Sequence, residues 1–221
     1  MGNQSTATAA RRPSESRTER SRASRLRVIE AAIDCIAEDG FDRATTTRIA
    51  RRAGVTWGLL QHQFGDKASL LEAVVDLVLE RGLEIAREAP IPDEGMAQRV
   101  AGLEKMLWRA LGTPGYRAFV EIQLHSCHEH VGLAVARRAS EALAGARDDL
   151  ARRWLEDLGV EPSRSRIALD VLLAGLRGLA LEVITMRRPI RFEKERKLIV
   201  EAVVHALDTG ETANRKRKGT R

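Results

Sequence analysis

Apolar residues recur three and four positions apart along most of the chain, and this helical period restricts the fold more than any other feature. The first clear stripe consists of Leu26, Ile29, Ile33, Ile36 and Ala37. It stops at Gly40, a residue type that commonly ends helices. No segment shows a convincing strand pattern, and aromatic residues make up only 4% of the chain. We therefore expect an all-α protein.

Capping residues and turn residues divide this helical pattern into elements. After Gly40, Thr45 or Thr46 can cap a short helix that runs through Ala53, and Thr56 can cap another that runs to about Gln63. A fourth helix is expected from the cap at Asp66 to about Glu88, before two prolines. Further helices are expected near 94–111, 116–130, 132–158, 163–187 and 192–208, with glycines such as Gly132 and prolines between them.

The segment 45–71, TTTRIARRAGVTWGLLQHQFGDKASLL, is the most informative part of the sequence. Gly54 predicts a tight turn between its two short helices, and Ala53 is small enough to let them approach. The positions expected to face inward are Ile49, Ala50, Val55, Leu60 and Phe64. This pattern predicts a helix-turn-helix, in which the second helix enters the DNA major groove.

The outward positions of the second helix are the candidates for DNA contact. They are Thr56, Trp57, Leu59, Gln61, His62 and Gln63. Most carry polar groups that can reach phosphates or base edges. Trp57 can pack on a thymine methyl or a sugar, or it can be a partly buried packing residue.

Residues 22–82 resemble the tetracycline-repressor (TetR) family of bacterial regulators. The matching positions are Ile29, Ala31, Ala32, Gly40, Phe41, Thr45, Ile49, Ala50, Ala53, Gly54, Val55, Gly58, Leu60, Phe64, Lys67, Leu70 and Leu71. The chain departs from the family in having Gln61 where Tyr is usual and Gln63 where His is frequent. Gln61 can donate to a phosphate, or it can read the N6 and N7 atoms of adenine.

The resemblance implies the roles of further residues. Thr45 and Lys67 are expected to anchor DNA phosphates at helix N-termini, and Gly58 to let the recognition helix lie close to the DNA. It also implies a homodimer formed by the last large helices. The segment 163–187 suits this role because Ala168, Ala174, Gly175 and Gly178 lie among leucines, although an ordinary core helix has the same composition.

The resemblance divides the chain into four parts. We expect a disordered basic arm at 1–21, the TetR-type DNA-binding domain at 22–82 with its helix-turn-helix at about 45–64, a ligand-binding and dimerisation domain at 83–210, and a basic tail at 211–221. Whether the basic ends contact DNA stays open.

A ligand pocket in the second domain is the least specified expectation. The candidates are the larger aromatic, sulfur-containing and polar side chains Met106, Trp108, Tyr116, Phe119, Gln123, His125, Trp154 and Met186. Residues of these types at helical spacing are also ordinary core residues.

The sequence lacks the characteristic signals of several other classes of protein. His125 and Glu129 share a helix face near Cys127, but no separate ligand pair completes a zinc site, so no metal or cofactor is expected. The sequence has no Gly-rich phosphate loop, nucleophile elbow or HExxH, which argues against an enzyme. No apolar run approaches the ~18 residues of a membrane span, and no signal peptide is visible, so we expect a cytoplasmic protein.

Together these features predict a sequence-specific transcriptional regulator. The net charge of +6 suits a polyanionic partner without requiring one. By resemblance, we expect a homodimeric repressor that a small-molecule effector releases from a palindromic, double-stranded DNA operator. The alternatives are a ligand-independent or activating regulator, or an architectural DNA-binding protein.

Overall fold

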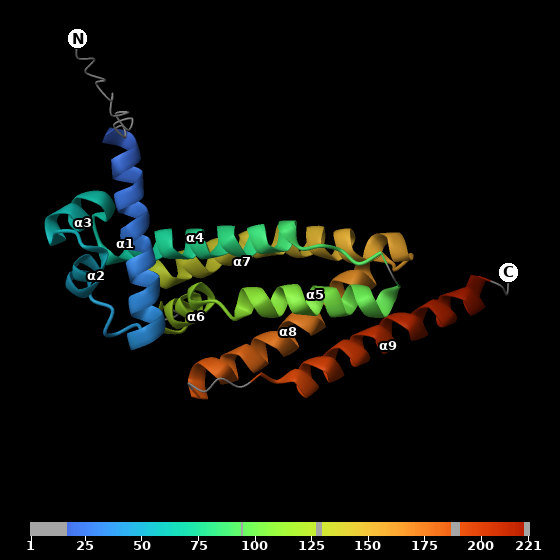
Figure 1. The fold of residues 1–221 in the computed structure, drawn as a ribbon. Coiled ribbons are helices and arrows are strands. Elements are labelled where there is room, and N and C mark those ends of the chain that lie inside the picture. The colour runs from blue at the N-terminus through green and yellow to red at the C-terminus, as the bar shows by residue number, and fades with distance from the viewer. Residues whose placement is uncertain (1–16, 94, 127–129, 187–190, 219–221) are drawn as a thin grey trace, which may run out of the picture.

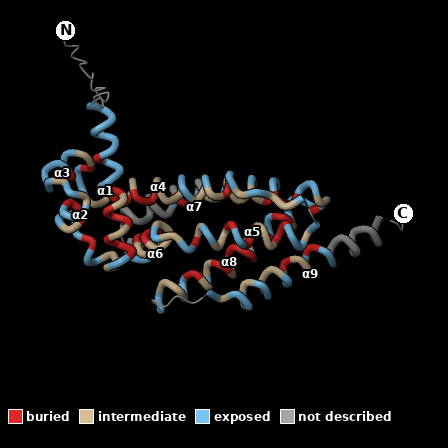
Figure 2. Tube along the Cα trace, viewed as in Figure 1, coloured by how far each residue is buried: buried red, intermediate tan, exposed pale blue. Residues whose placement is uncertain are grey.

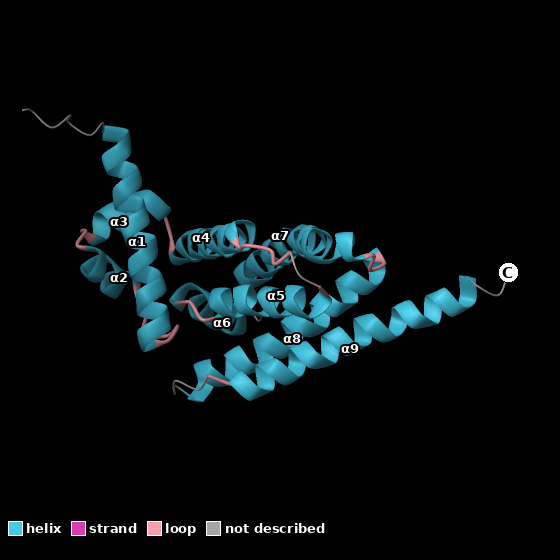
Figure 3. Ribbon diagram, turned by 45° about the vertical axis from the view of Figure 1, so that its right-hand side comes forward, coloured by secondary structure: helices cyan, strands magenta, loops and turns pink. Residues whose placement is uncertain are grey.

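The computed structural model describes residues 17–93, 95–126, 130–186 and 191–218, and every regular element in these ranges is helical (Figures 1 and 3). The α-helices are α1 (Arg17–Asp39), α2 (Thr46–Ala53), α3 (Trp57–Phe64), α4 (Lys67–Glu88), α5 (Met96–Leu111), α6 (Pro114–Ser126), α7 (His130–Leu155), α8 (Pro162–Met186) and α9 (Glu193–Lys218). A 3₁₀ turn, Glu156–Leu158, follows α7. The all-α prediction is confirmed.

Helix α1 crosses the end of the helical bundle and separates it from α2 and α3 (Figures 1 and 3). It begins at Arg17, so residues 17–21 are helical where a disordered arm was expected. The segment consists mainly of residues that tolerate helix well, and Glu19 lies in the first turn, where an acidic side chain complements the helix dipole. The rest of the expected arm, 1–16, lies outside the described residues.

Three further boundaries differ from expectation for local reasons. Helix α6 begins at Pro114, which was expected to be in a turn; the first helical position tolerates proline because its missing N–H would have no partner there. Gly132 lies inside α7, where a break was expected. Helix α9 continues to Lys218, so 211–218 is helical where a basic tail was expected; Gly210 alone does not end a helix.

The buried side chains form two clusters (Figure 2). The first cluster surrounds Ile36, Ile49 and Leu60, and joins α1, α2, α3, the first half of α4, α6 and Ala139 of α7. The second surrounds Trp154 and Leu172, and joins the end of α4 with α5, α7, α8 and α9. The expected boundary at 82–83 therefore falls inside the continuous helix α4.

Helix α6 also links the two clusters. Its Ala118, Phe119 and Ile122 are buried in the first cluster, although sequence reasoning placed them in the second domain. Tyr116, one turn earlier, packs against both clusters. Any movement of α6 must therefore be felt by the core beneath the helix-turn-helix, because packed interiors transmit strain.

Two ion pairs fix helix α5 within the bundle. The buried Arg99 guanidinium bonds to Asp157 at 2.7 Å and to the Trp154 carbonyl at 3.1 Å. Buried Glu104 accepts from Arg196 of α9 at 2.5 Å. Because Arg99 and Glu104 are the buried members of these pairs, loss of Asp157 or Arg196 would leave a buried charge without its partner. The position of α5 is thus well determined.

Candidate functional site

The α2–α3 unit is organised by local capping. The Thr45 hydroxyl accepts from the Arg48 N–H at 3.3 Å, and the Thr56 hydroxyl accepts from the Leu59 N–H at 3.2 Å. Between the helices Gly54 has φ +67°, a left-handed conformation that glycine adopts without strain. These caps begin α2 and α3 within one residue of the positions that the sequence predicts.

Helix α3 has one buried and one exposed face. Leu60 and Phe64 are buried against the first cluster. Trp57 is 55% exposed, so it is not a packing residue within the chain. The other expected contact residues that are exposed are Thr56, Gly58, Leu59, Gln61 and His62. A Cβ added at Gly58 would meet nothing within 4 Å, so this face is open to a partner surface.

Gln63 differs from its neighbours on α3. Its side chain is partly buried, and its Oε1 has no hydrogen-bond partner among the described atoms. Its backbone carbonyl accepts from Arg25 Nη1 at 2.8 Å, and the Arg25 guanidinium lies 4.2 Å from the Phe64 ring centre. The end of α3 is therefore fastened to α1. The helical period predicts Gln63 on the outward face of α3, because the period of one helix carries no information about the position of α1.

Lys67, expected to be a phosphate anchor, begins α4 at the edge of this unit. Its ammonium lies 4.4 Å from the centre of the Phe41 ring. The same ring stacks on His125 of α6, with centroids 4.7 Å apart and planes 16° apart. His125, expected in the ligand pocket, therefore lies at the junction with the α1–α2 loop. Phe41 connects α4 and α6 at this junction.

Ion pairs hold α2 against α1. Arg52 Nη1 lies 2.6 Å from Glu38 and its Nη2 lies 3.3 Å from Asp34, while Arg48 lies 2.6 Å from Asp39. The hydrogen bond from Arg52 lowers the pKa of Glu38 below its ordinary value. By contrast, four exposed arginines of α1 form no ion pair with the described residues. They are Arg17, Arg20, Arg22 and Arg27, and with them this end of the molecule presents uncompensated positive charge.

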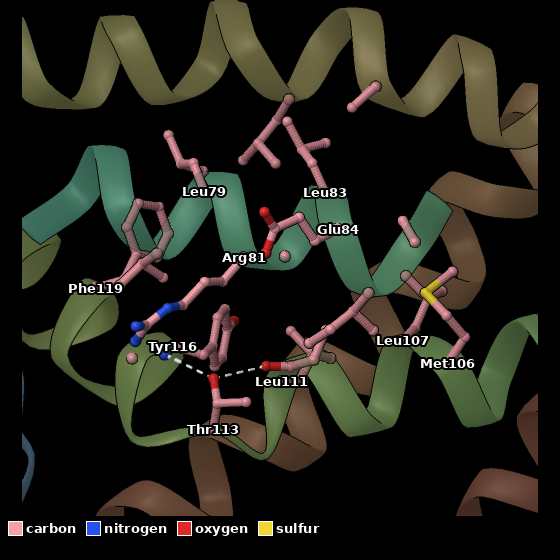
Figure 4. Close-up of a pocket in the computed structure, with 18 of the residues that line it drawn as sticks. Leu79, Arg81, Leu83, Glu84, Met106, Leu107, Leu111, Thr113, Tyr116 and Phe119 are labelled. Carbon is pink, nitrogen blue, oxygen red and sulfur yellow. Dashed lines mark hydrogen bonds between the residues drawn. The ribbon is translucent and has the colours of Figure 1, made fainter. Parts of the chain in front are cut away.

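A cavity of about 520 Å³ lies in the helical bundle and is lined by residues of α1, α4, α5, α6, α7 and α8 (Figure 4). Its walls are predominantly aliphatic and aromatic, as is usual for small-molecule sites of this size. Three expected pocket residues, Met106, Tyr116 and Phe119, meet in this cavity. Leu79 and Leu83 of α4 also line the cavity (Figure 4).

The other expected pocket residues do not line this cavity. Trp108 lines a neighbouring cleft of about 360 Å³, with the Arg196 guanidinium 4.7 Å from its ring centre. Trp154 is fully buried in the second cluster, and Met186 is exposed at the end of α8. Gln123 is partly buried elsewhere on α6. Residue type alone does not distinguish side chains that pack in a core from side chains that line the cavity.

Several polar residues that line the cavity were not predicted from the sequence. They are Glu30, Arg81, Thr113, Arg147 and Arg177. The Thr113 hydroxyl caps α6 by accepting from the Tyr116 N–H at 3.1 Å, and it donates to the Ala110 carbonyl at 3.0 Å. The available signal was an arginine inside an otherwise apolar run, as at Arg177 in LLAGLRGLAL.

The outer face of α8 is apolar and exposed. Ile167 and Val171 are 61% and 55% exposed, and the stripe continues through Ala174, Gly178 and Leu181. Gly175 does not belong to it: a Cβ there would lie 3.0 Å from Ile199 of α9 in the same chain. Of the small residues noted in the sequence, Gly175 therefore packs against α9 within the chain, whereas Gly178 is exposed.

The histidine-rich segment carries no metal site in the part that can be described. Cys127, His128 and Glu129 lie outside the described residues, and no group of three metal-ligating side chains occurs among the others. Cys35 is buried, and this burial raises the pKa of its thiol. Within the described helices, none has the length and apolarity that crossing a bilayer requires.

The exposed, capped helix α3, set by a tight turn against α2 beside uncompensated basic side chains, defines a helix-turn-helix DNA-binding protein. Residues 28–74 match the model of bacterial regulatory proteins of the tetR family. This match assigns a tetR-type DNA-binding domain to residues 28–74.

Curated relatives agree over different lengths. The transcriptional regulator BetI of Klebsiella pneumoniae is 40% identical over 81 residues, which is 36% of this chain and only 42% of that protein. BetI of Cronobacter sakazakii is 27% identical over 187 residues, covering 83% of this chain and 90% of that protein. The stronger identity is thus confined to a part of the chain.

Solved structures share the fold over most of the chain. A transcriptional regulator from Rhodococcus sp. Rha1 has a TM-score of 0.65 at 20% identity, covering 85% of this chain and 97% of that one. SmeT, in a complex with triclosan, has a TM-score of 0.60 at 23% identity, covering 83% and 91%. The multidrug-binding protein EbrR, in a complex with imidazole, has a TM-score of 0.56 at 22% identity, covering 80% and 93%.

Proposed function

We propose that this regulator is a homodimeric repressor that leaves a palindromic operator when a small molecule occupies the cavity in its helical bundle. Residues 22–82 form the DNA-binding domain, and residues 83–210 the ligand-binding and dimerisation domain. The observation that carries the proposal is the packing of α6, which lines the cavity with Phe119 and enters the core of the helix-turn-helix with Ile122. The protein acts in the cytoplasm and has no catalytic role.

The proposed DNA contacts divide into two kinds. Trp57, Leu59, Gln61 and His62 face the base edges and sugars of the major groove, and Gly58 permits close approach. The phosphate contacts come from helix N-termini, at Thr45, Thr56 and Lys67. The backbone carbonyl of Gln63 fastens the end of α3 to α1 by accepting a hydrogen bond from Arg25. The exposed arginines of α1 add phosphate contacts beside α3.

The proposed dimer forms through the exposed apolar stripe of α8. Ile167, Val171 and Leu181 belong to it, and Leu198 of α9, the helix that packs on α8, is 66% exposed. Large exposed apolar side chains in a continuous stripe mark an interaction surface. A second copy of the chain suits this surface, because two recognition helices about 34–36 Å apart would enter successive major grooves.

The proposed switch uses helices α4 and α6, which both line the cavity and pack in the first cluster. Helix α4 leads from α3 to the cavity wall, and α6 joins the cavity to the first cluster. A ligand that favours another position of these helices would change the spacing of the recognition helices. A coupling of ~1–3 kcal/mol gives a 5- to 150-fold change in operator affinity. SmeT and EbrR, which share the fold, were each solved with a small molecule.

The test begins with selection of bound sequences from random DNA by the full chain. We expect a short palindrome with two identical half-sites. Small molecules that raise the melting temperature are then titrated with and without that operator. By linkage, an effector must bind more weakly to the operator complex. Selection of no consensus would favour an architectural protein, and equal ligand affinity in both titrations would favour a ligand-independent regulator.

A further inference from the structure

The three arginines that line the cavity differ in their partners. Arg81 is paired with Glu30 through two guanidinium nitrogens, one at 3.0 Å. Arg147 lies 3.5 Å from Asp170 and donates to the Leu143 carbonyl at 3.3 Å. Arg177 is partly buried and forms no ion pair or hydrogen bond with the described residues. Its charge has no counterpart within the described cavity wall.

The acidic side chains around the cavity do not neutralise Arg177. Glu30 is occupied by Arg81, and Asp34 lies 3.3 Å from Arg52 of α2. Glu84 and Glu88 are exposed on α4, where water solvates their carboxylates. The cavity therefore combines acids that are paired or hydrated with one positive charge that is partly removed from water, a state that an anion would relieve.

Tyr116 provides a second polar group near Arg177. Burial raises the pKa of the Tyr116 phenol, and the neighbouring positive charge of Arg177 partly opposes that shift. The phenol is consequently neutral at ordinary pH and retains an O–H donor, which forms no hydrogen bond to a described residue. In Figure 4 its ring stands between the α4 side chains and Thr113.

The remaining wall is apolar, and it includes Leu79, Leu83, Met106, Phe119 and Leu173. Such a wall favours a ligand with a hydrocarbon or aromatic body. We propose that the effector is an amphipathic carboxylic acid, whose apolar body fills the cavity and whose carboxylate pairs with Arg177 and accepts a hydrogen bond from Tyr116. This inference rests on the proposed ligand-controlled function and names the chemical class of the effector.

Three probes with the same ten-carbon chain test the head group on the full-length protein: decanoate, 1-decanol and decyltrimethylammonium. Calorimetric titration should give one decanoate per chain, bound at least tenfold more tightly than decanol, with the cation weakest. Arg177→Gln should weaken decanoate binding about 10- to 100-fold, as expected for charge-assisted hydrogen bonds, and change decanol binding less than about twofold. Tyr116→Phe should weaken decanoate binding about 3- to 10-fold.

Arg147→Gln is the matched control, because this cavity arginine already has a carboxylate partner; it should leave decanoate affinity within about twofold of the original. Equal affinities for decanoate and decanol, tighter binding of the cation, or no binding of decanoate would each overturn the carboxylate assignment. If Arg177→Gln fails to fold, the comparison of probes on the unmodified protein decides. Operator selection tests the regulator proposal separately, since it needs no effector.

Discussion

The α2–α3 unit and the cavity differ in how far apart in the sequence their residues lie. The exposed residues of α3 belong to one helix, Trp57–Phe64, whose ends are set by Thr56 and Gly65 beside it. The cavity wall is drawn from six helices, including residues as distant in sequence as Glu30 and Arg177. A change on α3 should therefore remain local, whereas a change in the cavity wall should reach several helices at once. The following predictions test this contrast.

The largest expected effect is at Phe119, which is buried in the first cluster and also lines the cavity. Phe119→Ala should lower the free energy of unfolding by about 3–5 kcal/mol, because it removes a large side chain from a packed core. Urea denaturation measures the change. Trp57→Ala, on the exposed face, should change it by less than about 0.5 kcal/mol. A loss below about 1 kcal/mol for Phe119→Ala would argue against its linking role.

Next in size is the effect of charge on the α8 stripe. Ile167→Glu with Val171→Glu should give folded monomers, since both side chains are exposed within the chain, and should reduce operator affinity at least about 100-fold. Sedimentation and a DNA-binding titration measure the two outcomes. Leu124→Glu is the control, because Leu124 is exposed on α6 away from the stripe. A double variant that remains dimeric would place the interface elsewhere.

A smaller effect is expected from the recognition helix. Gln61→Ala should change the preference at one base pair of each half-site, with ~1–3 kcal/mol of discrimination lost, because a bidentate amide contact reads one base. Binding to a panel of single-base operator variants measures it. Gln63→Ala provides the comparison and should leave the base preference unchanged, because its side chain is partly buried and the backbone carbonyl that binds Arg25 is retained. Uniform weakening by Gln61→Ala would identify a phosphate contact.

The smallest effect concerns the phosphate anchor. Lys67→Ala should lower the slope of log affinity against log salt by about one unit per half-site and weaken all sequences alike. Lys105→Ala, an exposed change on α5, should leave the slope unaltered. If Lys67→Ala also leaves it unaltered, the Phe41 contact would be the whole role of this lysine.

This difference in sequence separation explains which features could be predicted from the sequence. Thr45, Gly54 and Thr56 act on neighbours within a few residues, so capping and turn rules located α2 and α3. Whether Met106 lines the cavity, or Trp154 fills a core, depends on how far apart distant helices lie. Neither the helical period nor the residue type predicts the distance between those helices. Gln63 illustrates the limit inside the better-predicted unit, since it is partly buried at a position that the helical period predicts to be exposed.

Helix α4 has a mechanical consequence that follows from its continuity. Its 22 residues from Lys67 to Glu88 form one rod of roughly 33 Å, without a proline to bend it. A sideways shift of about 2 Å at the cavity end, pivoted at the other end, turns the rod by roughly 3–4° by simple geometry on that length. In a two-fold dimer the paired rods would turn in opposite senses, so their angular errors would add. A small molecule that shifts the cavity end of α4 by about 2 Å would therefore misalign the recognition helices of both subunits.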